Sequence, residues 1–381
     1  MVEKKDNTSF PERLSNDEQL TIFQKAINKG YSNTVNLFDS IPFYETTQPK
    51  NHPGYLIKNF DIDDKASDTH INYTAKIFIG SFLKEAKRGK NKGQQQIITR
   101  FPNQTDELIV RFIIKLATEG QSFLSGGHVS VAFSLYQIYE EFKSKKITRS
   151  YAEIFESIEI LSSSLTDLEW IDEFGKKRSC KASIFSDRRY ISPADAPIDY
   201  KGKKDLFCVT LHPTVTKAIV DKSFRQLNYD RHMILSFFLT RWLHIKLTQN
   251  FTWANHYLDR PFHIALSNII KNSGVKPYST INHDIERVED SIQELVKAKV
   301  LDGERTFTER KYASAKRKYT IDAVFNLFPT DSFSKEQKIA NKLVKDIKHK
   351  TGYSELLEYI NQKLIHLDKM TLPRFLLIYV F

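Results

Sequence analysis

The stretch TINHDIERVEDSIQELVKAKV, residues 280–300, carries the clearest helical period in the chain. Its apolar side chains follow one another at spacings of four, three, four, three and one residues. They are Ile281, Ile285, Val288, Ile292, Leu295 and Val296. This spacing places one apolar stripe against a core and leaves the polar residues of the first two turns facing outward. We therefore predict an amphipathic helix that opens at Thr280 with an exposed polar start.

The segments on either side of this helix complete a motif. A shorter helix is predicted over residues 261–271, and the turn NSGVKPYS, residues 272–279, joins the two helices. The strand-like segments VLDGERTF, residues 300–307, and KRKYTIDAVF, residues 316–325, follow with a tip rich in Lys and Arg between them. Two helices joined by a turn and followed by a basic hairpin are typical of a winged helix-turn-helix.

The same order is present earlier in the chain. Helices over residues 135–145 and from Thr148 are followed by a strand over 168–171, a basic turn over 175–181 and a return strand over 183–191. The apolar positions of the two long helices superimpose at an offset of 134 residues. The matching pairs are Tyr151 with Ile285, Ile154 with Val288, Ile158 with Ile292, and Leu161 with Leu295. This is a similarity of pattern with few identities.

We predict an α+β fold, mainly helical, with two tandem winged-helix domains, each a helix-turn-helix with a β-hairpin wing, plus N- and C-terminal extensions. Residues 1–100 are expected to form an N-terminal extension and basic linker, and residues 101–200 the first winged-helix module. Residues 201–330 are expected to form the second module, which includes a long helix over 231–249. A Lys-rich helical C-terminal extension covers residues 331–381.

The charge is unevenly distributed along the chain. There are 57 Lys and Arg against 46 Asp and Glu, a formal net charge of +11. Residues 201–381 hold 30 Lys and Arg and 19 Asp and Glu, which is the whole excess, while residues 1–200 are neutral. A generally Lys-rich composition would spread the excess more evenly. A basic half beside a neutral half favours a polyanion partner for the basic half, with nucleic acid the first candidate.

Composition excludes several classes of protein. Cys180 and Cys208 are too few for a disulfide framework or a four-cysteine zinc site. No apolar run approaches the roughly 18 residues that span a membrane. The first 30 residues contain no secretory apolar core. We expect a reduced, cytoplasmic protein without membrane contact.

Sequence motifs typical of catalysis are missing. The sequence contains no phosphate-binding loop, no dinucleotide-binding turn and no HExxH pattern. We therefore predict no catalytic residues, no metal site and no cofactor, in a protein that is not an enzyme. Asp199 with Lys201, and Asp172 and Glu173 with Lys176, form carboxylate–lysine patterns that leave a nuclease as a distant alternative.

The start of the helix at Thr280 and the hairpin after it form the candidate DNA-binding surface. A helix N-terminus presents unpaired N–H groups to phosphates, while Asn and Arg side chains read bases. The candidate residues are Lys276, Tyr278, Ser279, Thr280, Asn282, His283, Arg287, Arg310, Lys311, Lys316, Arg317 and Lys318. Acidic residues further along the helix restrict contact to its first two turns. An ordinary amphipathic helix in a protein core, followed by a solvated basic loop, is the alternative.

The first module carries a more acidic outward helix face, so we expect it to add weaker contacts. Its candidate auxiliary phosphate contacts are Arg149, Ser150, Lys176, Lys177 and Arg178. The apolar segment HVSVAFSL, residues 128–135, is expected to be an edge strand that pairs across a two-fold axis. This module is therefore predicted to mediate a homodimer.

Four stretches resemble those of the plasmid replication initiator (Rep) proteins, which bind repeated origin sequences called iterons. They are LFCVTLHPTVTKAIV (206–220), RQLNYDRHMILSFFLTRWLHI (225–245), IQELVKAKVL (292–301) and KRKYTID (316–322). The resemblance covers about residues 101–330. It implies a non-enzymatic initiator in the bacterial cytoplasm, associated with the nucleoid or a plasmid. The implied partners are double-stranded DNA with direct repeats, a second copy of the chain, the host initiator and the replicative helicase.

Two further classes of function stay open. A tandem winged-helix transcriptional regulator would bind DNA but would not support replication from an origin. A protein–protein scaffold with a basic half would show no salt-dependent binding to duplex DNA.

Overall fold

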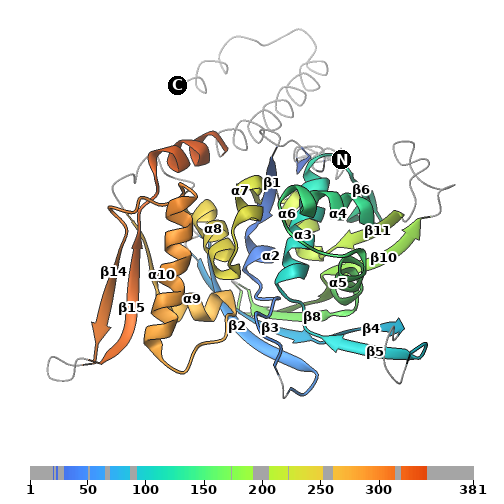
Figure 1. Ribbon diagram of the computed structural model, residues 1–381, viewed down its shortest axis with the longest axis horizontal. Helices are drawn as coiled ribbons and strands as arrows, with labels where there is room; N and C mark the ends of the chain where they lie inside the picture. Colours follow the sequence, from blue (N-terminus) through green and yellow to red (C-terminus); the bar gives the residue numbers. More distant parts are fainter. Residues whose placement is uncertain are drawn as a thin grey trace, which may run out of the picture.

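Strands form a large share of the chain, and within the described residues they make five antiparallel sheets (Figure 1). The computed structural model describes residues 20, 23–24, 30–49, 52–64, 69–85, 92–172, 174–191, 206–221, 223–251, 261–313 and 319–340. The prediction of a mainly helical fold is wrong, and the protein is a mixed α+β fold. Many of the missed strands lie in the first hundred residues, in segments that were expected to be loop and linker.

One four-stranded sheet joins the N-terminal region to the first predicted module. Its strands, in spatial order, are β2 (Tyr55–Asp64), β3 (Thr69–Phe78), β8 (Leu165–Ile171) and β9 (Lys177–Ser183). Ala75 of β3 lies opposite Leu168 of β8, and both side chains are fully buried. The expected hairpin of residues 168–171 with 183–191 is not formed: β8 pairs with β9, which covers most of the expected turn, and residues 185–191 belong to another sheet. The assignment of tandem winged helices is not confirmed.

A second four-stranded sheet has the order β10 (Phe185–Ile191), β11 (Leu206–Leu211), β7 (His128–Ser134) and β6 (Ser122–Ser125). Strand β7 pairs with β11 on one side and with β6 on the other. The expectation that HVSVAFSL forms an edge strand is therefore wrong, because its backbone groups are paired on both sides. Strand β11 lies beyond the boundary expected at residue 200, yet it pairs with β7 and β10; the domain division itself stays a prediction.

A three-stranded sheet has the order β13 (Phe262–Ala265), β15 (Thr320–Leu327) and β14 (Phe307–Tyr312). Three helices lie next to it in the chain: α8 (Phe238–Asn250), α9 (Leu266–Ser273) and α10 (Ile281–Lys297). The helix expected over residues 261–271 is strand β13 followed by α9. The long helix expected over 231–249 is two helices, α7 (Tyr229–Ile234) and α8, with an extended backbone at Leu235 and Phe237 between them.

Two pairs of strands complete the sheets. Strand β1 (Tyr31–Val35) pairs with β12 (Phe224–Asn228), almost two hundred residues later in the sequence. Strands β4 (Gly80–Glu85) and β5 (Gln95–Arg100) pair with each other.

Helices with strong local signals form where the sequence predicts them. Capping boxes open α3 (Gln104–Thr118), α4 (Leu135–Ser144) and α5 (Tyr151–Ser163), because a polar side chain and the side chain three residues later satisfy each other's backbone N–H groups. The remaining helices are α2 (Asn36–Ser40) and α6 (Pro213–Val220). Residues 331–340 are helical, and the rest of the predicted C-terminal extension lies outside the described residues.

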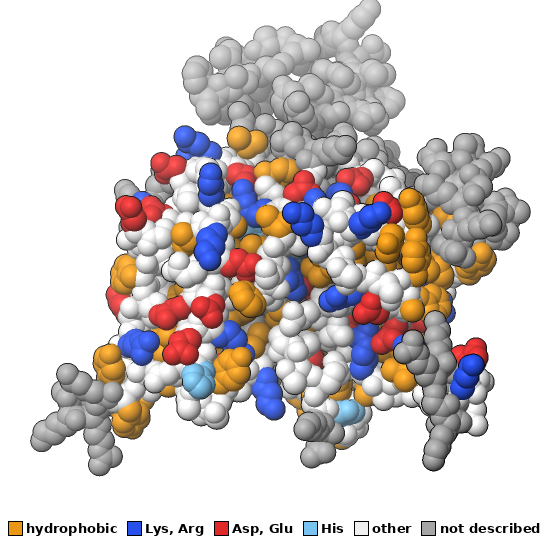
Figure 2. All heavy atoms as spheres, in the orientation of Figure 1, with side chains coloured by type: hydrophobic (Ala, Val, Ile, Leu, Met, Phe, Trp, Pro, Cys, Tyr) orange, Lys and Arg blue, Asp and Glu red, His pale blue; other side chains and the backbone are white. Residues whose placement is uncertain are grey.

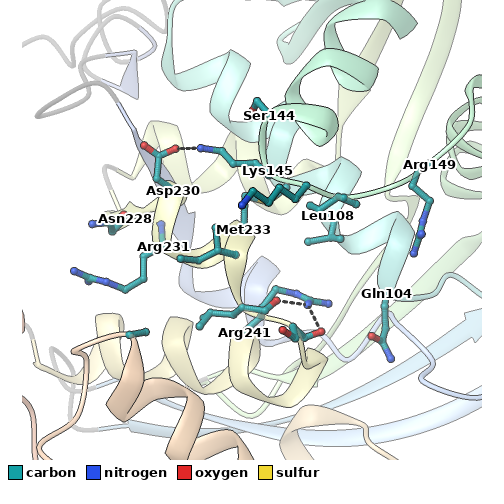
Figure 3. Close-up of a pocket in the computed structure, with 16 residues that line it drawn as sticks. Gln104, Leu108, Ser144, Lys145, Arg149, Asn228, Asp230, Arg231, Met233 and Arg241 are labelled. Atoms are coloured by element: carbon teal, nitrogen blue, oxygen red, sulfur yellow. Dashed lines mark hydrogen bonds and ion pairs between the residues drawn. The ribbon is translucent and has the colours of Figure 1, made fainter.

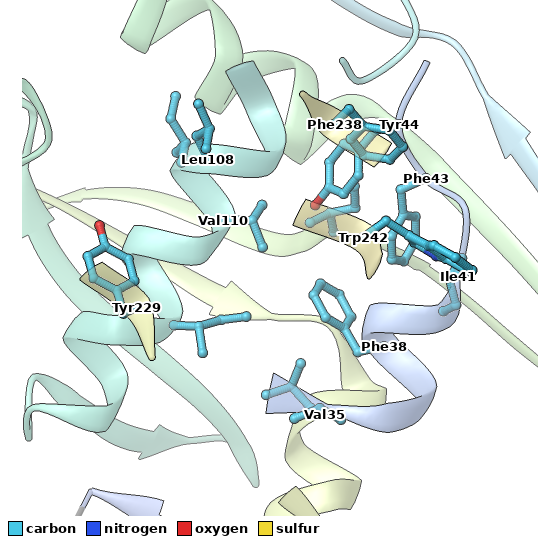
Figure 4. Packing of buried hydrophobic residues seen from close by; sticks show 14 of the residues in the cluster. Val35, Phe38, Ile41, Phe43, Tyr44, Leu108, Val110, Tyr229, Phe238 and Trp242 are labelled. Atoms are coloured by element: carbon cyan, nitrogen blue, oxygen red, sulfur yellow. The ribbon is translucent and has the colours of Figure 1, made fainter. Parts of the chain in front are cut away.

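One hydrophobic core contains residues from the N-terminal region and from both predicted modules. Figure 4 shows Phe38, Phe43 and Tyr44 packed near Phe238 and Trp242 of α8. Tyr44 and Phe238 meet edge to face, with ring centroids 6.4 Å apart. Helix α3 lies within this core and has most of its residues buried. Residues of the N-terminal region therefore contribute to this core, while the division into domains stays a prediction.

Candidate nucleic-acid interface

Helix α10 begins with an open N-terminus. Thr280 occupies the N-cap position but makes no side-chain hydrogen bond to the helix. Thr280 is exposed, as are Lys276, Tyr278 and Ser279 in the turn before it. The first N–H groups of the helix have no side-chain cap, and the positive end of the helix dipole faces solvent. Four of the predicted DNA-binding residues therefore lie on one exposed turn.

Asp284 and Arg287 hold this turn in place. The buried carboxylate of Asp284 accepts hydrogen bonds from the backbone N–H of Tyr278 at 3.1 and 3.2 Å and from the guanidinium of Arg287 at 2.5 Å. Arg287 also donates to the carbonyl oxygen of Lys276 at 3.0 Å and lies 4.6 Å from the centroid of the Tyr278 ring. Arg287, a predicted base contact, is therefore engaged within the turn. Sequence reasoning missed Asp284, although an acid three residues before an Arg on a helix is a recognisable pair.

The hairpin contacts the start of the helix. Asn282 and His283 are exposed in the first turn of α10. Arg310 of β14 donates from Nη1 to Oδ1 of Asn282 at 3.4 Å, which brings two predicted residues together. Lys311 faces the opposite side of the strand and lies in register with Asp322 of β15. The predicted contacts that lie outside the described residues are Lys316, Arg317 and Lys318.

The rest of the exposed face of α10 is acidic. Glu286 and Asp290 are exposed, and Figure 2 shows acidic side chains gathered over this helix. Phosphate groups would be repelled from these turns. The structure therefore leaves only the start of α10, together with the neighbouring face of β14, suited to approach a duplex.

At the start of α5, the predicted phosphate contacts have structural roles. The hydroxyl of Ser150 accepts a hydrogen bond from the backbone N–H of Glu153, whose carboxylate accepts from the backbone N–H of Ser150 at 2.7 Å. Ser150 is thus the cap of α5. Arg149 donates to the neutral oxygens Thr105 Oγ1 at 3.1 Å and Thr148 O at 2.7 Å. Neither acceptor neutralises the Arg149 charge.

Two cations at the start of β9 are matched by carboxylates. Lys177 forms an ion pair with Glu169 at 2.9 Å, and Arg178 forms one with Asp172 at 2.7 Å. Lys176 is exposed and gives its backbone N–H to the Asp172 carboxylate. The hydrogen bonds that Asp172 accepts keep the pKa of its carboxyl below its usual value. A phosphate would have to compete with these acids.

Two open grooves meet beside the exposed turn. The basic groove, of about 1000 Å³, lies between the α4–α5 turn and α7, and Figure 3 shows it from close by. Its charged lining residues are Lys145, Lys146, Arg149, Asp230, Arg231 and Arg241. The turn groove, of about 820 Å³, is lined by the turn before α10 and by Phe237. Gln104 lines both grooves, so the two grooves are neighbours on either side of that residue.

A buried charge cluster beneath these grooves was not predicted. Glu107 of α3 accepts from Arg241 Nε at 2.7 Å, and its other oxygen lies 3.2 Å from His232 Nε2. All three side chains are buried. Burial alone would raise the pKa of Glu107, but Arg241 and His232 lower it to about 2. Burial lowers the pKa of His232, against the opposing effect of Glu107.

This cluster ties distant parts of the chain together. Arg111, one turn after Glu107, donates to the buried carboxylate of Asp39 in α2 at 2.6 Å. Burial holds the pKa of His244 in α8 well below its usual value. The cluster therefore connects the N-terminal region, α3 and the α7–α8 segment through side chains with little access to water.

Comparisons with known proteins show a weak structural likeness. No family model and no curated protein matches the chain. Among solved structures, domains 2 and 3 of RctB in a selenomethionine derivative match with 10% identity and a TM-score of 0.43, covering 77% of this chain and 98% of that one. A second structure of RctB domains 2–3, residues 155–483, has 9% identity and a TM-score of 0.39, covering 77% and 97%. At this level of identity, the likeness assigns no role to any single residue.

The described residues also bear on membrane and metal binding. Within them no helix is long and apolar enough to cross a membrane. In the same part of the chain, no group of three or more His, Cys, Asp or Glu side chains is placed to hold a metal ion.

Proposed function

We propose that this chain is a DNA-binding replication initiator without enzymatic activity of its own. The observation that carries the proposal is the contact between Arg310 and Asn282, which joins the exposed start of α10 to the hairpin β14–β15. Side chains for base reading and a cation for phosphate contact are thereby gathered at one open helix N-terminus. The charge excess of +11, all in residues 201–381, supports a polyanion as the ligand.

The finer parts of this proposal rest on the resemblance to Rep proteins. We propose that the DNA is a plasmid origin with direct repeats, bound in the bacterial cytoplasm by a homodimer. Cooperative binding and bending would help to open an AT-rich tract. The host initiator and the replicative helicase would then be recruited. The resemblance in residues 206–220, 225–245 and 292–301 supports this reading.

The experiment has two parts. Selection of bound sequences from a random duplex library should enrich a motif that recurs as direct repeats in the DNA flanking the gene. A plasmid that carries those repeats, but no initiator gene, should replicate only when the chain is supplied. Motif enrichment without replication would favour a transcriptional regulator instead.

A scaffold protein and a nuclease would each behave differently toward the same DNA. A scaffold would show no duplex binding that weakens with salt, whereas phosphate contacts make log affinity fall linearly with log salt. A nuclease would cut plasmid DNA when a divalent metal is added. Either result would contradict the proposal.

A further inference from the structure

The basic groove and the turn groove are neighbours beside α10, and we call the two grooves together the channel. The turn groove lies along the N-terminal half of this helix, and the basic groove reaches Ala298 at its C-terminal end. They meet at Gln104 and along the consecutive residues Ser236 and Phe237, one in each groove.

Apolar side chains project into this channel without being covered. Phe237 is 54% exposed, Ile234 is 61% exposed and Tyr278 is 54% exposed. Phe237 is not on a loose loop, because Glu294 of α10 accepts hydrogen bonds from the backbone N–H of Ser236 at 2.6 Å and of Phe237 at 3.4 Å. An aromatic ring held at a fixed place in an open groove is a surface on which a flat ligand can stack.

The two ends of the channel differ in charge. At the basic end, Arg149 donates hydrogen bonds to two neutral oxygens and lies near enough to Glu153 to lower the pKa of its carboxyl, and Lys146 is exposed. Lys145 there is paired with Asp230 at 2.5 Å. The α10 wall carries Glu286 and Asp290 instead. A ligand with negative groups along one side would therefore lie with those groups toward the α4–α5 turn and with its apolar part against Phe237.

We propose that this channel binds a single strand of nucleic acid. Its phosphates would contact Lys146 and Arg149, and its unpaired bases would stack on Phe237 and the neighbouring Ile234. Grooves that bind single strands combine cations along the backbone with aromatic side chains under the bases. A duplex fits this channel less well, because its base faces are stacked on one another and are not available to Phe237. The turn before α10 borders both this channel and the proposed duplex surface, whereas Phe237 and Lys146 line the channel alone.

The test measures fluorescence anisotropy of labelled single strands, DNA and RNA of one sequence, with the full chain. Phe237→Ala should weaken binding of the single strand about tenfold or more, the range for loss of one stacked base. Ile171→Ala is the matched control, because Ile171 is 65% exposed on β8 and does not line the channel. That variant should bind like the wild type.

Lys146→Ala provides the second variant and tests the phosphate contact. Loss of one phosphate contact should flatten the slope of log affinity against log salt by about 0.7 for a single strand. Duplex binding, measured in parallel, should be unchanged by Phe237→Ala. Wild-type affinity of Phe237→Ala for both single strands, or no binding of either strand by the wild type, would overturn this inference. Failure of duplex binding alone would overturn the proposed function and not this one.

Discussion

The helix pairs α4–α5 and α9–α10 share one sequence pattern and differ in surroundings. The buried stripe Ile154, Ile158 and Leu161 of α5 matches the stripe Val288, Ile292 and Leu295 of α10 at the same offset. After α5, strands β8 and β9 continue a sheet begun by β2 and β3. After α10, strands β14 and β15 pair with each other and with the short β13. Equal helix patterns therefore do not predict equal hairpins.

The two hairpins differ in the strands that are available to pair with them. The N-terminal hairpin β2–β3 offers its edge to β8, and the first hairpin is absorbed into the sheet. Strand β14 has no second partner among the described residues, and its cation Arg310 reaches the start of α10. Two cations at the start of β9 are paired with acids of its own sheet. The comparison predicts that duplex DNA is bound at α10 and only weakly at α5.

The largest expected effect comes from the buried cluster of Glu107, His232 and Arg241, which joins α3 to α7 and α8. Glu107→Gln leaves Arg241 buried without its carboxylate, which should cost about 3–5 kcal/mol of unfolding free energy. Glu169→Gln is the control, since its ion pair with Lys177 is exposed and should contribute at most about 1 kcal/mol. Urea unfolding at neutral pH measures both. Equal losses of unfolding free energy in the two variants would show that the cluster does not hold α3 against α7 and α8.

The same variant has a defined pH dependence. Glu107 has a pKa of about 2 when folded, against an ordinary value of 4.5. Its carboxylate therefore stabilises the folded chain above about pH 4.5, and that contribution is lost as the pH falls from 4.5 toward 2. The difference in stability between wild type and Glu107→Gln should shrink over this window. A difference independent of pH would contradict the assignment.

Sequence reasoning located the features that depend on local signals. Helices α5 and α10 were predicted because an apolar period and a polar start lie within a few residues of each other. The exposed start of α10 followed from the same stripe. Strand β1 could not be found in this way, because its partner β12 lies almost two hundred residues away. Strand β7 was recognised as a strand, but whether it lies at an edge depends on β11, beyond residue 200.

In the candidate site too, the residue types could be predicted from the sequence, but the contacts between them could not. Asn282 and Arg310 were both named from their residue types, but their contact depends on how the hairpin folds back on the helix. Arg287 was taken as a base contact because a helical period places it outward. Its engagement with Asp284 and the carbonyl of Lys276 depends on the path of the preceding turn, which no period describes.

The next largest effect is expected from Asn282, which we propose to contact a base, in contrast to Asp284 and Arg287, which support the turn. Asn282→Ala should cost about 1–3 kcal/mol on the selected duplex site and much less on random duplex, as for loss of a base contact. Thr148→Ala is the matched control, because Thr148 is exposed at the equivalent offset of 134 residues in the first region. Its affinity should be unchanged. If Asn282→Ala binds both duplexes as the wild type does, base reading lies elsewhere.

Arg287→Ala and Asp284→Ala extend this second prediction to the turn. Asp284→Ala removes the acceptor of the Tyr278 N–H, and Arg287→Ala removes the donor to the Lys276 carbonyl, so each variant loosens the same turn. They should therefore weaken binding to the selected site by similar factors, although Asp284 is buried and acidic. A loss seen in Arg287→Ala alone would restore Arg287 as a base contact.

The smallest expected effect concerns the two hairpins and their salt dependence. Arg310→Ala should flatten the slope of log affinity against log salt on random duplex by about 0.9, the contribution of one neutralised phosphate. Lys311→Ala should alter the slope less, because adjacent strand residues face opposite sides and Arg310 is on the side of α10. In the first region, Arg178→Ala should leave the slope unchanged, since Asp172 already neutralises that cation. Titrations at several salt concentrations compare the three variants. A flatter slope in Arg178→Ala than in Arg310→Ala would place the duplex on the β8–β9 sheet and reverse the comparison between the two regions.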